Sequence, residues 1–167
     1  MNETNQPAAR RIETPRGAVD IVADPDALAA AAAIRFVAAT TAATNERGRA
    51  FVALSGGSTP KRMGRLLASP TYRERVDWDR LDLFWGDERW VPLASEESNA
   101  GEALRDFIGR VPIPLDRVHP FPTDLATPAA AAAAYEATIR AAFGLAAGVP
   151  RFDLIFLGMG DDGHTAS

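Results

Sequence analysis

The chain has 167 residues, a formal net charge of -4 and a pI of about 5.2, and it contains no cysteine. Its length suffices for one domain with a buried core, and its hydrophobic content of 47% is that of an ordinary globular protein. The acidic balance argues against nucleic acid as the main partner, and the lack of thiols excludes disulfides, thiolate catalysis and cysteine-bound metals. We find no basic and apolar leader and no apolar run of membrane-spanning length, so we expect a cytoplasmic protein that binds no membrane.

The first third of the chain predicts a tail, a pair of strands, a long helix and a buried strand. Residues 1–10 are polar and are expected to form a flexible tail, with a single domain over residues 11–167. Asp24 can cap the long helix, and Pro25 fits its first turn. The strands and the helix are expected, in chain order, at residues 11–14, 18–22, 25–44 and 51–54.

The remaining two thirds alternate between helical and strand patterns. Short apolar runs bounded by turn residues predict strands, and capping residues followed by apolar positions at helical spacing predict helices. In chain order these elements are a helix over 60–67, a strand over 81–85, a helix capped by Ser98 or Asn99 and ending at 111, a short strand over 118–121, an alanine-rich helix over 127–143 and a strand over 152–157.

This alternation is typical of an α/β fold, namely a doubly wound three-layer sandwich with a mostly parallel sheet. In such folds ligands bind beyond the carboxyl ends of the strands. Three polar loops leave predicted strand ends, at residues 55–60, 86–89 and 158–164. We therefore expect these loops to converge on one site.

The first loop is Ser55-Gly56-Gly57-Ser58-Thr59-Pro60. Thr59 is expected to cap the following helix, with Pro60 at its first position. Free amides at the positive end of a helix, together with three hydroxyls, form a pocket for an anion. The spacing does not fit a nucleoside-triphosphate loop, so a single phosphate is favoured. An ordinary tight turn with a good cap explains the segment about equally well.

The second loop, Gly86-Asp87-Glu88-Arg89, places two acids and a guanidinium directly after a strand. Arg89 can bind a phosphate or a carboxylate through two hydrogen bonds, and Asp87 can orient a base or a substrate hydroxyl. The alternative is a solvated turn with a local ion pair.

The third loop is Gly158-Met159-Gly160-Asp161-Asp162-Gly163-His164. Its glycine spacing matches a dinucleotide-binding fingerprint, but such a fingerprint normally belongs to the first strand–helix unit of a domain. Imidazole titrates near neutral pH and can act as a general base, so Asp162 and His164 favour acid–base chemistry instead. His119, the other histidine, is expected to be structural or surface-exposed.

Taken together and in this order, the three loops resemble the 6-phosphogluconolactonase family. The resemblance rests on Leu54 to Pro60, on Gly86 to Arg89 followed by Ser98-Asn99, and on Leu157 to Ser167. It implies hydrolysis of 6-phosphoglucono-δ-lactone to 6-phosphogluconate in the oxidative pentose phosphate pathway, without metal or cofactor. The implied partner is this small-molecule phosphosugar lactone, with the chain as a monomer or weak homo-oligomer.

The resemblance also implies a role for each site residue. In it, the 6-phosphate is held by Ser55, Gly56, Gly57, Ser58 and Thr59, with assistance from Arg89. His164 deprotonates the attacking water, and Asp162 and Asp87 shape the site. Asp161 stands where the family pattern has proline, and its charge is expected to raise the pKa of Asp162. The family continues well beyond its histidine loop, so we expect this chain to be C-terminally truncated, with an incomplete sheet.

Two alternatives remain open from the sequence. The superfamily also contains glucosamine-6-phosphate deaminase, which abstracts a proton from a sugar carbon; the residues from Gly86 to Arg89 fit the lactonase better. A non-catalytic sugar-phosphate-binding domain, or an inactive fragment, is the second alternative.

Overall fold

The computed structural model describes residues 10–165. Residues 1–9 of the expected tail, and Ala166 and Ser167 of the third motif, lie outside the described residues. The helices and strands are β1 (Arg10–Thr14), β2 (Gly17–Ile21), α1 (Pro25–Arg47), β3 (Ala50–Leu54), α2 (Ser58–Leu67), α3 (Pro70–Arg73), β4 (Leu81–Trp85), α4 (Asn99–Asp106), α5 (Pro128–Phe143) and β5 (Leu154–Ile155), with short 3-10 turns at residues 78–80, 108–110 and 115–117.

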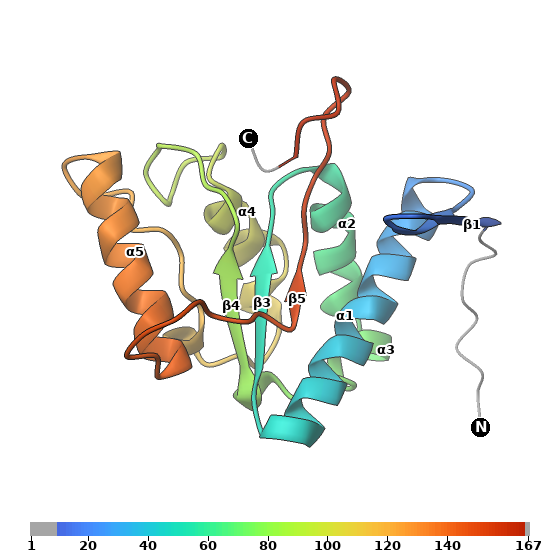
Figure 1. Cartoon of the computed structure of the whole chain (residues 1–167), viewed down its shortest axis with the longest axis horizontal. Helices are drawn as coiled ribbons and strands as arrows, with labels where there is room; N and C mark the ends of the chain where they lie inside the picture. Colours follow the sequence, from blue (N-terminus) through green and yellow to red (C-terminus); the bar gives the residue numbers. More distant parts are fainter. Residues whose placement is uncertain (1–9, 166–167) are drawn as a thin grey trace.

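The main sheet has the order β4-β3-β5, and both pairs of strands are parallel. The arrows in Figure 1 therefore point the same way, toward the edge from which the three polar loops leave. The strand predicted over 118–121 is reduced to one bridge, between Val118 and Leu83, next to which the His119 amide donates to the Leu83 carbonyl at 2.8 Å. The parallel α/β sheet predicted from the sequence is confirmed.

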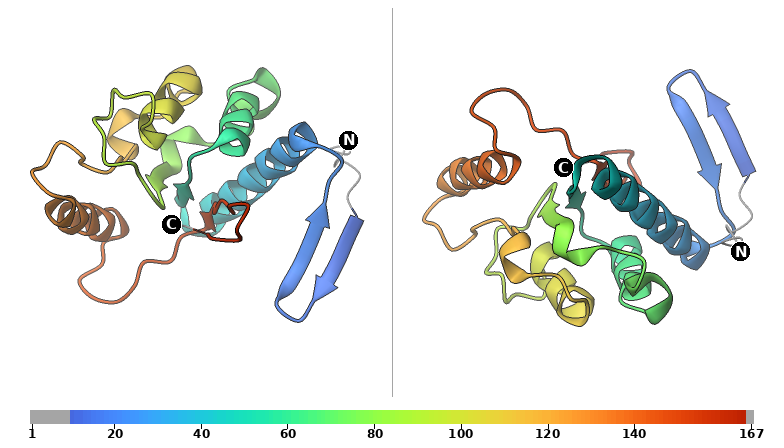
Figure 2. Two further views of the ribbon diagram at one scale, coloured as in Figure 1. Left: turned by 90° about the horizontal axis from the view of Figure 1, so that it is seen from above. Right: turned by 90° about the horizontal axis from the view of Figure 1, so that it is seen from below.

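Helices cover both faces of this sheet. Alternate strand residues point to opposite faces, so Val52 and Leu83 pack toward α1, α2 and α4, whereas Ala53 and Phe84 pack toward α5. Figure 2 shows α5 on one side and α1, α2 and α4 on the other. The molecule thus has the three layers of the predicted sandwich.

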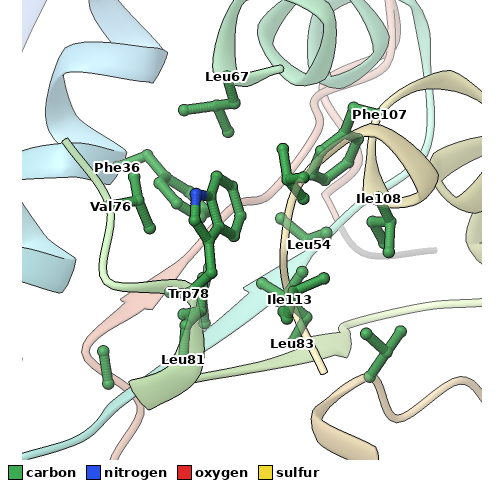
Figure 3. Close-up of a cluster of buried hydrophobic side chains, with 14 of the residues drawn as sticks. Phe36, Leu54, Leu67, Val76, Trp78, Leu81, Leu83, Phe107, Ile108 and Ile113 are labelled. Atoms are coloured by element: carbon green, nitrogen blue, oxygen red, sulfur yellow. The ribbon is translucent and has the colours of Figure 1, made fainter. Parts of the chain in front are cut away.

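The larger core lies on the face of α1, α2 and α4. Trp78 is 3% exposed and lies among Phe36, Val76 and Leu67, as Figure 3 shows. The Trp78 ring lies 6.3 Å from that of Phe36, and its indole N–H donates to the Arg73 carbonyl at 2.8 Å. The buried indole therefore keeps its hydrogen bond while it fills the space between α1 and the sheet.

Tyr135 of α5 joins the second core to the backbone of β4. Its hydroxyl accepts from the Trp85 amide at 2.8 Å and lies 3.1 Å from the His119 carbonyl, to which it can donate. Burial raises the pKa of Tyr135 because it disfavours the phenolate. The hydroxyl thus stays neutral and satisfies backbone groups where β4 and the segment at His119 separate.

β1 and β2, the two short strands predicted here, pair antiparallel, with Ile12 opposite Val19. In Figure 1 this hairpin stands beyond the first turn of α1, away from the sheet. Asp20 of the hairpin accepts from Arg35 of α1 at 2.5 Å. This contact is mostly exposed to solvent and contributes little stability.

α1 is long and apolar enough, by length and composition alone, to cross a membrane, with a mean hydropathy of 1.5. By this criterion the expectation that no apolar run reaches membrane-spanning length is wrong. Core helices of globular proteins have similar compositions, and α1 packs here against α2, β3 and β5. Its buried side chains, which include Phe36, belong to the larger core.

The observed helix caps agree with two of the predictions and differ from a third. Asp24 accepts from the Ala27 amide at the start of α1, and Thr127 accepts from the Ala130 amide at the start of α5, as predicted. The cap predicted for α2 is wrong. Gly57 caps that helix without a side-chain hydrogen bond, and Thr59 and Pro60 lie inside its first turn.

The start of α4 is fixed by two residues, Ser98 and Glu88. Ser98, one of the two predicted caps, accepts from the Gly101 amide at 3.0 Å. The Glu88 carboxylate accepts from the amides of Asn99 and Ala100 at 2.7 and 3.0 Å and from the Ser98 hydroxyl at 3.1 Å. A carboxylate suits the positive end of a helix, so Glu88 ties the loop after β4 to α4.

Asp82 is a fully buried carboxylate on the α5 face, near the amino end of β4. It accepts from Arg49 at 2.6 and 2.9 Å, from the His119 ring at 2.9 Å and from Arg117 at 3.3 Å. Burial opposes ionisation of Asp82, but the hydrogen bonds from His119 and Arg49 prevail and lower its pKa. His119 also stacks on Phe84 at 4.4 Å, which agrees with the structural role considered for it.

We predict that Asp82→Asn lowers the free energy of unfolding at pH 7 by about 3 kcal/mol, because it neutralises a fully buried carboxylate and leaves the partly exposed Arg49 and Arg117 without their anion. Since the pKa of Asp82 is lowered on folding, its contribution is complete above the ordinary value of 3.8 and declines as the pH falls below it. Urea titrations should therefore show a constant difference near neutral pH that narrows in acid. Asp79→Asn, an exposed change nearby, is the control, and an equal loss in both variants would contradict the prediction.

We predict that Glu88→Ala lowers the free energy of unfolding by about 2 kcal/mol, because it removes the acceptor for two helix-terminal amides and a hydroxyl. Glu97→Ala removes the same charge close to the same helix end from an exposed side chain, and it should cost less than ~0.5 kcal/mol. Chemical denaturation measures both variants. Similar losses would show that charge near α4, rather than these hydrogen bonds, matters.

Candidate active site

A cleft of about 370 Å³ opens where the three polar loops meet, at the carboxyl edge of the sheet. The strand order places the loop after β3 between those after β4 and β5. The cleft is lined by Ser55 and Gly56 of the first loop, Gly86, Asp87 and Arg89 of the second, and Leu157, Gly158, Met159, Gly160 and His164 of the third.

The structure brings together some of the residues expected from the sequence and leaves others beside the cleft. Those that line it are Ser55, Gly56, Asp87, Arg89 and His164. Gly57, Ser58 and Thr59 lie at the start of α2, next to the lining residues, and Asp162 contacts His164 from outside the lining. Each of the three predicted loops therefore contributes at least one of the expected residues to the cleft.

The first loop presents the amino end of α2. Gly57 has φ 108 and ψ 174, a conformation open essentially to glycine alone. The first backbone bond of this helix runs from the Lys61 amide to the Gly57 carbonyl. Within residues 10–165, the amides of Ser58 and Thr59 have no acceptor. Free amides at the positive end of a helix are suited to an anion.

In the second loop the three charged side chains behave differently. Glu88 is occupied by the start of α4. Asp87 is half-buried and receives the side-chain amide of Asn99, at 3.2 Å on its carbonyl and 3.3 Å on its carboxylate. Arg89 is exposed, and its guanidinium has no hydrogen bond or ion pair within the described part of the chain. Arg89 is thus the cation that can bind an anion in this cleft.

The third loop closes on itself. The Gly163 amide donates to the Gly160 carbonyl, and the Gly160 amide donates to the His164 carbonyl, both at 2.9 Å. A Cβ on Gly160 would lie 2.3 Å from Cε1 of the His164 ring, so the imidazole packs directly on this glycine. The turn holds His164 beside the cleft.

His164 and Asp162 form a pair in which Nδ1 lies 2.5 Å from Oδ1. The hydrogen bond from His164 lowers the pKa of Asp162, so the expected rise caused by Asp161 is wrong. An ionised carboxylate only accepts hydrogen bonds. Nδ1 therefore carries the proton, and in the neutral ring Nε2 holds the lone pair that can accept another. No hydrogen bond to Nε2 occurs within residues 10–165.

Sequence reasoning missed two kinds of residue at this site. It gave Asn99 no task beyond capping, yet Asn99 contacts Asp87 and lies against Gly56. It also overlooked Leu157 and Met159, which add an apolar wall and are mostly exposed. The spacing of Asn99 from Asp87 gives no local signal, because the contact depends on how α4 returns to the loop. Within residues 10–165 no three His, Asp or Glu side chains are grouped so as to hold a metal ion.

Known proteins with similar sequences share one description. A family model described as glucosamine-6-phosphate isomerases/6-phosphogluconolactonase matches residues 23–167. The 6-phosphogluconolactonase of Synechocystis sp. is 41% identical over 150 residues, which make up 89% of this chain and 61% of that protein. The 6-phosphogluconolactonase of Mycobacterium tuberculosis is 38% identical over 156 residues, with the same coverage. The chain thus spans 61% of the length of these curated relatives.

Solved structures agree. The 6-phosphogluconolactonase from Thermotoga maritima has a TM-score of 0.72 and 34% identity over 84% of this chain and 59% of its own. That from Trypanosoma cruzi has a TM-score of 0.72 and 32% identity over 85% and 58%. A monomeric glucosamine-6-phosphate deaminase, at 20% identity, shares the fold. The chain belongs to the glucosamine-6-phosphate isomerase/6-phosphogluconolactonase family.

Proposed function

We propose that this chain forms a site for hydrolysis of 6-phospho-D-glucono-1,5-lactone to 6-phosphogluconate. The observation that carries the proposal is one cleft that contains both an oriented imidazole, His164, and the glycine loop at the amino end of α2. A lactone carbonyl needs an activated water at one end of the molecule, and a remote phosphate supplies positioning energy at the other. The substrate is then a small phosphosugar in the cytoplasm, acted on by a single domain over residues 11–167.

The chemistry follows from the tautomer of His164. Nε2 takes a proton from water while the water oxygen attacks C1 of the lactone. Asp162 holds the Nδ1 proton and stabilises the imidazolium that forms. The C1–O5 bond then breaks, and the proton on Nε2 passes to O5, which becomes the C5 hydroxyl. The products are a carboxylic acid and an alcohol in one molecule, with no other reactant consumed.

The phosphate would lie against the amides of Gly57, Ser58 and Thr59, near Ser55 and Gly56, with Arg89 opposite. The free amides at this helix end and the unpaired guanidinium are the described groups that favour a dianion here. In a chain of net charge -4 such local groups are needed to attract the ligand.

Deamination of glucosamine 6-phosphate is the second candidate. Its support is the fold shared with the deaminase of known structure, whereas the relatives that are 36% identical or more are 6-phosphogluconolactonases. Measuring lactone consumption above its spontaneous rate, alongside ammonia release from glucosamine 6-phosphate, separates the two. Ammonia release without lactone turnover would overturn the proposal.

We predict that His164→Ala lowers kcat by about 10²–10⁴-fold, the usual contribution of a general base, with little change in 6-phosphogluconate affinity. Asp162→Asn should lower kcat less, because the imidazolium that forms on His164 loses the ionised neighbour that stabilises it. Steady-state kinetics of lactone hydrolysis at neutral pH, together with titration of 6-phosphogluconate, measure both variants. An unchanged kcat in His164→Ala would exclude this residue as the base.

We predict that Arg89→Gln weakens binding of 6-phosphogluconate by roughly 10-fold or more, because it removes a charge-assisted hydrogen bond to the anion. Titration calorimetry measures the affinity. Arg110→Gln, in the 3-10 turn that follows α4, removes the same charge from an exposed side chain without a hydrogen-bond partner among the described residues, and it should leave binding unchanged. Equal weakening in both variants would point to net charge instead.

A further inference from the structure

Asn99 lies between the first and second loops of the cleft. Its Nδ2 donates to the carbonyl of Asp87 at 3.2 Å and to the Asp87 carboxylate at 3.3 Å. On the other side, a Cβ added to Gly56 would lie 1.9 Å from Oδ1 of Asn99 and 2.4 Å from its Cγ. One amide group therefore contacts both loops.

Gly56 owes its identity to this contact. Its backbone is not among the glycines with positive φ, so another residue could adopt its conformation. What prevents a side chain at position 56 is the Asn99 amide, which occupies the space of the Cβ. The amide thus sets how closely the first loop approaches α4.

Asn99 is itself held firmly. Its backbone amide donates to Glu88 at 2.7 Å, and it is the first residue of α4 after the Ser98 cap. α4 is joined to α2 by Lys61 and Glu102, whose side chains lie 2.6 Å apart. Asn99 lines a small cavity of about 20 Å³ beneath the first loop and is absent from the lining of the cleft. It therefore acts on the site through other residues.

We propose that Asn99 is a positioning residue that fixes the Asp87 carboxylate relative to the glycine loop at residues 55–57. The inference rests on the proposed function, since it takes the glycine loop to hold the phosphate and Asp87, which lines the same cleft, to face the rest of the substrate. A ligand that contacts both groups depends on their separation, whereas free phosphate contacts the glycine loop alone. Errors of about 1 Å in such positioning cost up to ~10²-fold in rate.

Asn99→Ala tests this role. Alanine favours helix formation, and the backbone hydrogen bond to Glu88 remains. We expect kcat for the lactone and affinity for 6-phosphogluconate each to fall about 10-fold or more, with affinity for inorganic phosphate within about twofold of the parent. Asn45→Ala, on an exposed face of α1, is the control and should change none of these. Equal weakening for both ligands, or no change, would overturn the proposal.

A second measurement needs no turnover. Gly56→Ala should lower the Tm, and the loss should shrink by at least half when position 99 is also alanine, because the obstructing amide is gone. Additive losses would show that Asn99 does not restrain this loop and would overturn the inference. If the parent chain neither hydrolyses the lactone nor binds 6-phosphogluconate, the proposed function is wrong. The Tm values of the single and double variants would still show whether Asn99 restrains the first loop.

Discussion

Parallel pairing of β3 with β4 on one side and β5 on the other is the constraint on which the cleft depends. Three strands that run the same way must deliver their following loops to one edge, and the order β4-β3-β5 puts the glycine loop in the middle. β5 pairs over only two residues, so its loop relies on other contacts. Asp153 supplies them, because its carboxylate accepts from the Phe51 amide and contacts Arg47 at the end of α1.

The charged groups around the sheet fall into two sets, those with partners inside the described part of the protein and those without. Two carboxylates of β4 and its following loop are already bound by the protein: Glu88 by α4, and Asp82 by two arginines and a histidine. Burial raises the cost of leaving such groups unpaired, so they organise the fold. Arg89 and the first amides of α2, by contrast, are left without internal partners in the described chain. This division gives an acidic protein a local place for an anion.

Much of this arrangement could be predicted from the sequence. The features that could not be predicted depend on how distant parts of the chain come together or on the geometry of a turn. Asp24 and Thr127 predict the starts of their helices because capping is a local interaction. The apolar runs at residues 51–54 and 81–85 likewise predict the buried strands. The predicted cap of α2, Thr59, was wrong because the helix already begins at Ser58. Both hydroxyl residues can serve as a cap, so the sequence does not distinguish between these two starts. The tasks of Glu88 and Asn99 were invisible, because each depends on α4 folding back onto the loop after β4. The lowered pKa of Asp162 comes instead from the turn itself, in which the His164 ring packs on Gly160 and its hydrogen bond reaches Asp162.

Four glycines of the first and third loops resist substitution for two separate reasons, and this limits how the sequence can drift. Gly56 and Gly160 have room in their backbone angles but none for an added carbon, since Asn99 and His164 occupy that space. Gly57 and Gly163 have open space around them but positive φ angles of 108° and 85°. A substitution of the first kind can be suppressed by shrinking the neighbour, although at position 160 that neighbour is the imidazole itself. A substitution at Gly57 has no second-site suppressor of that sort, because the strain lies within its own peptide units.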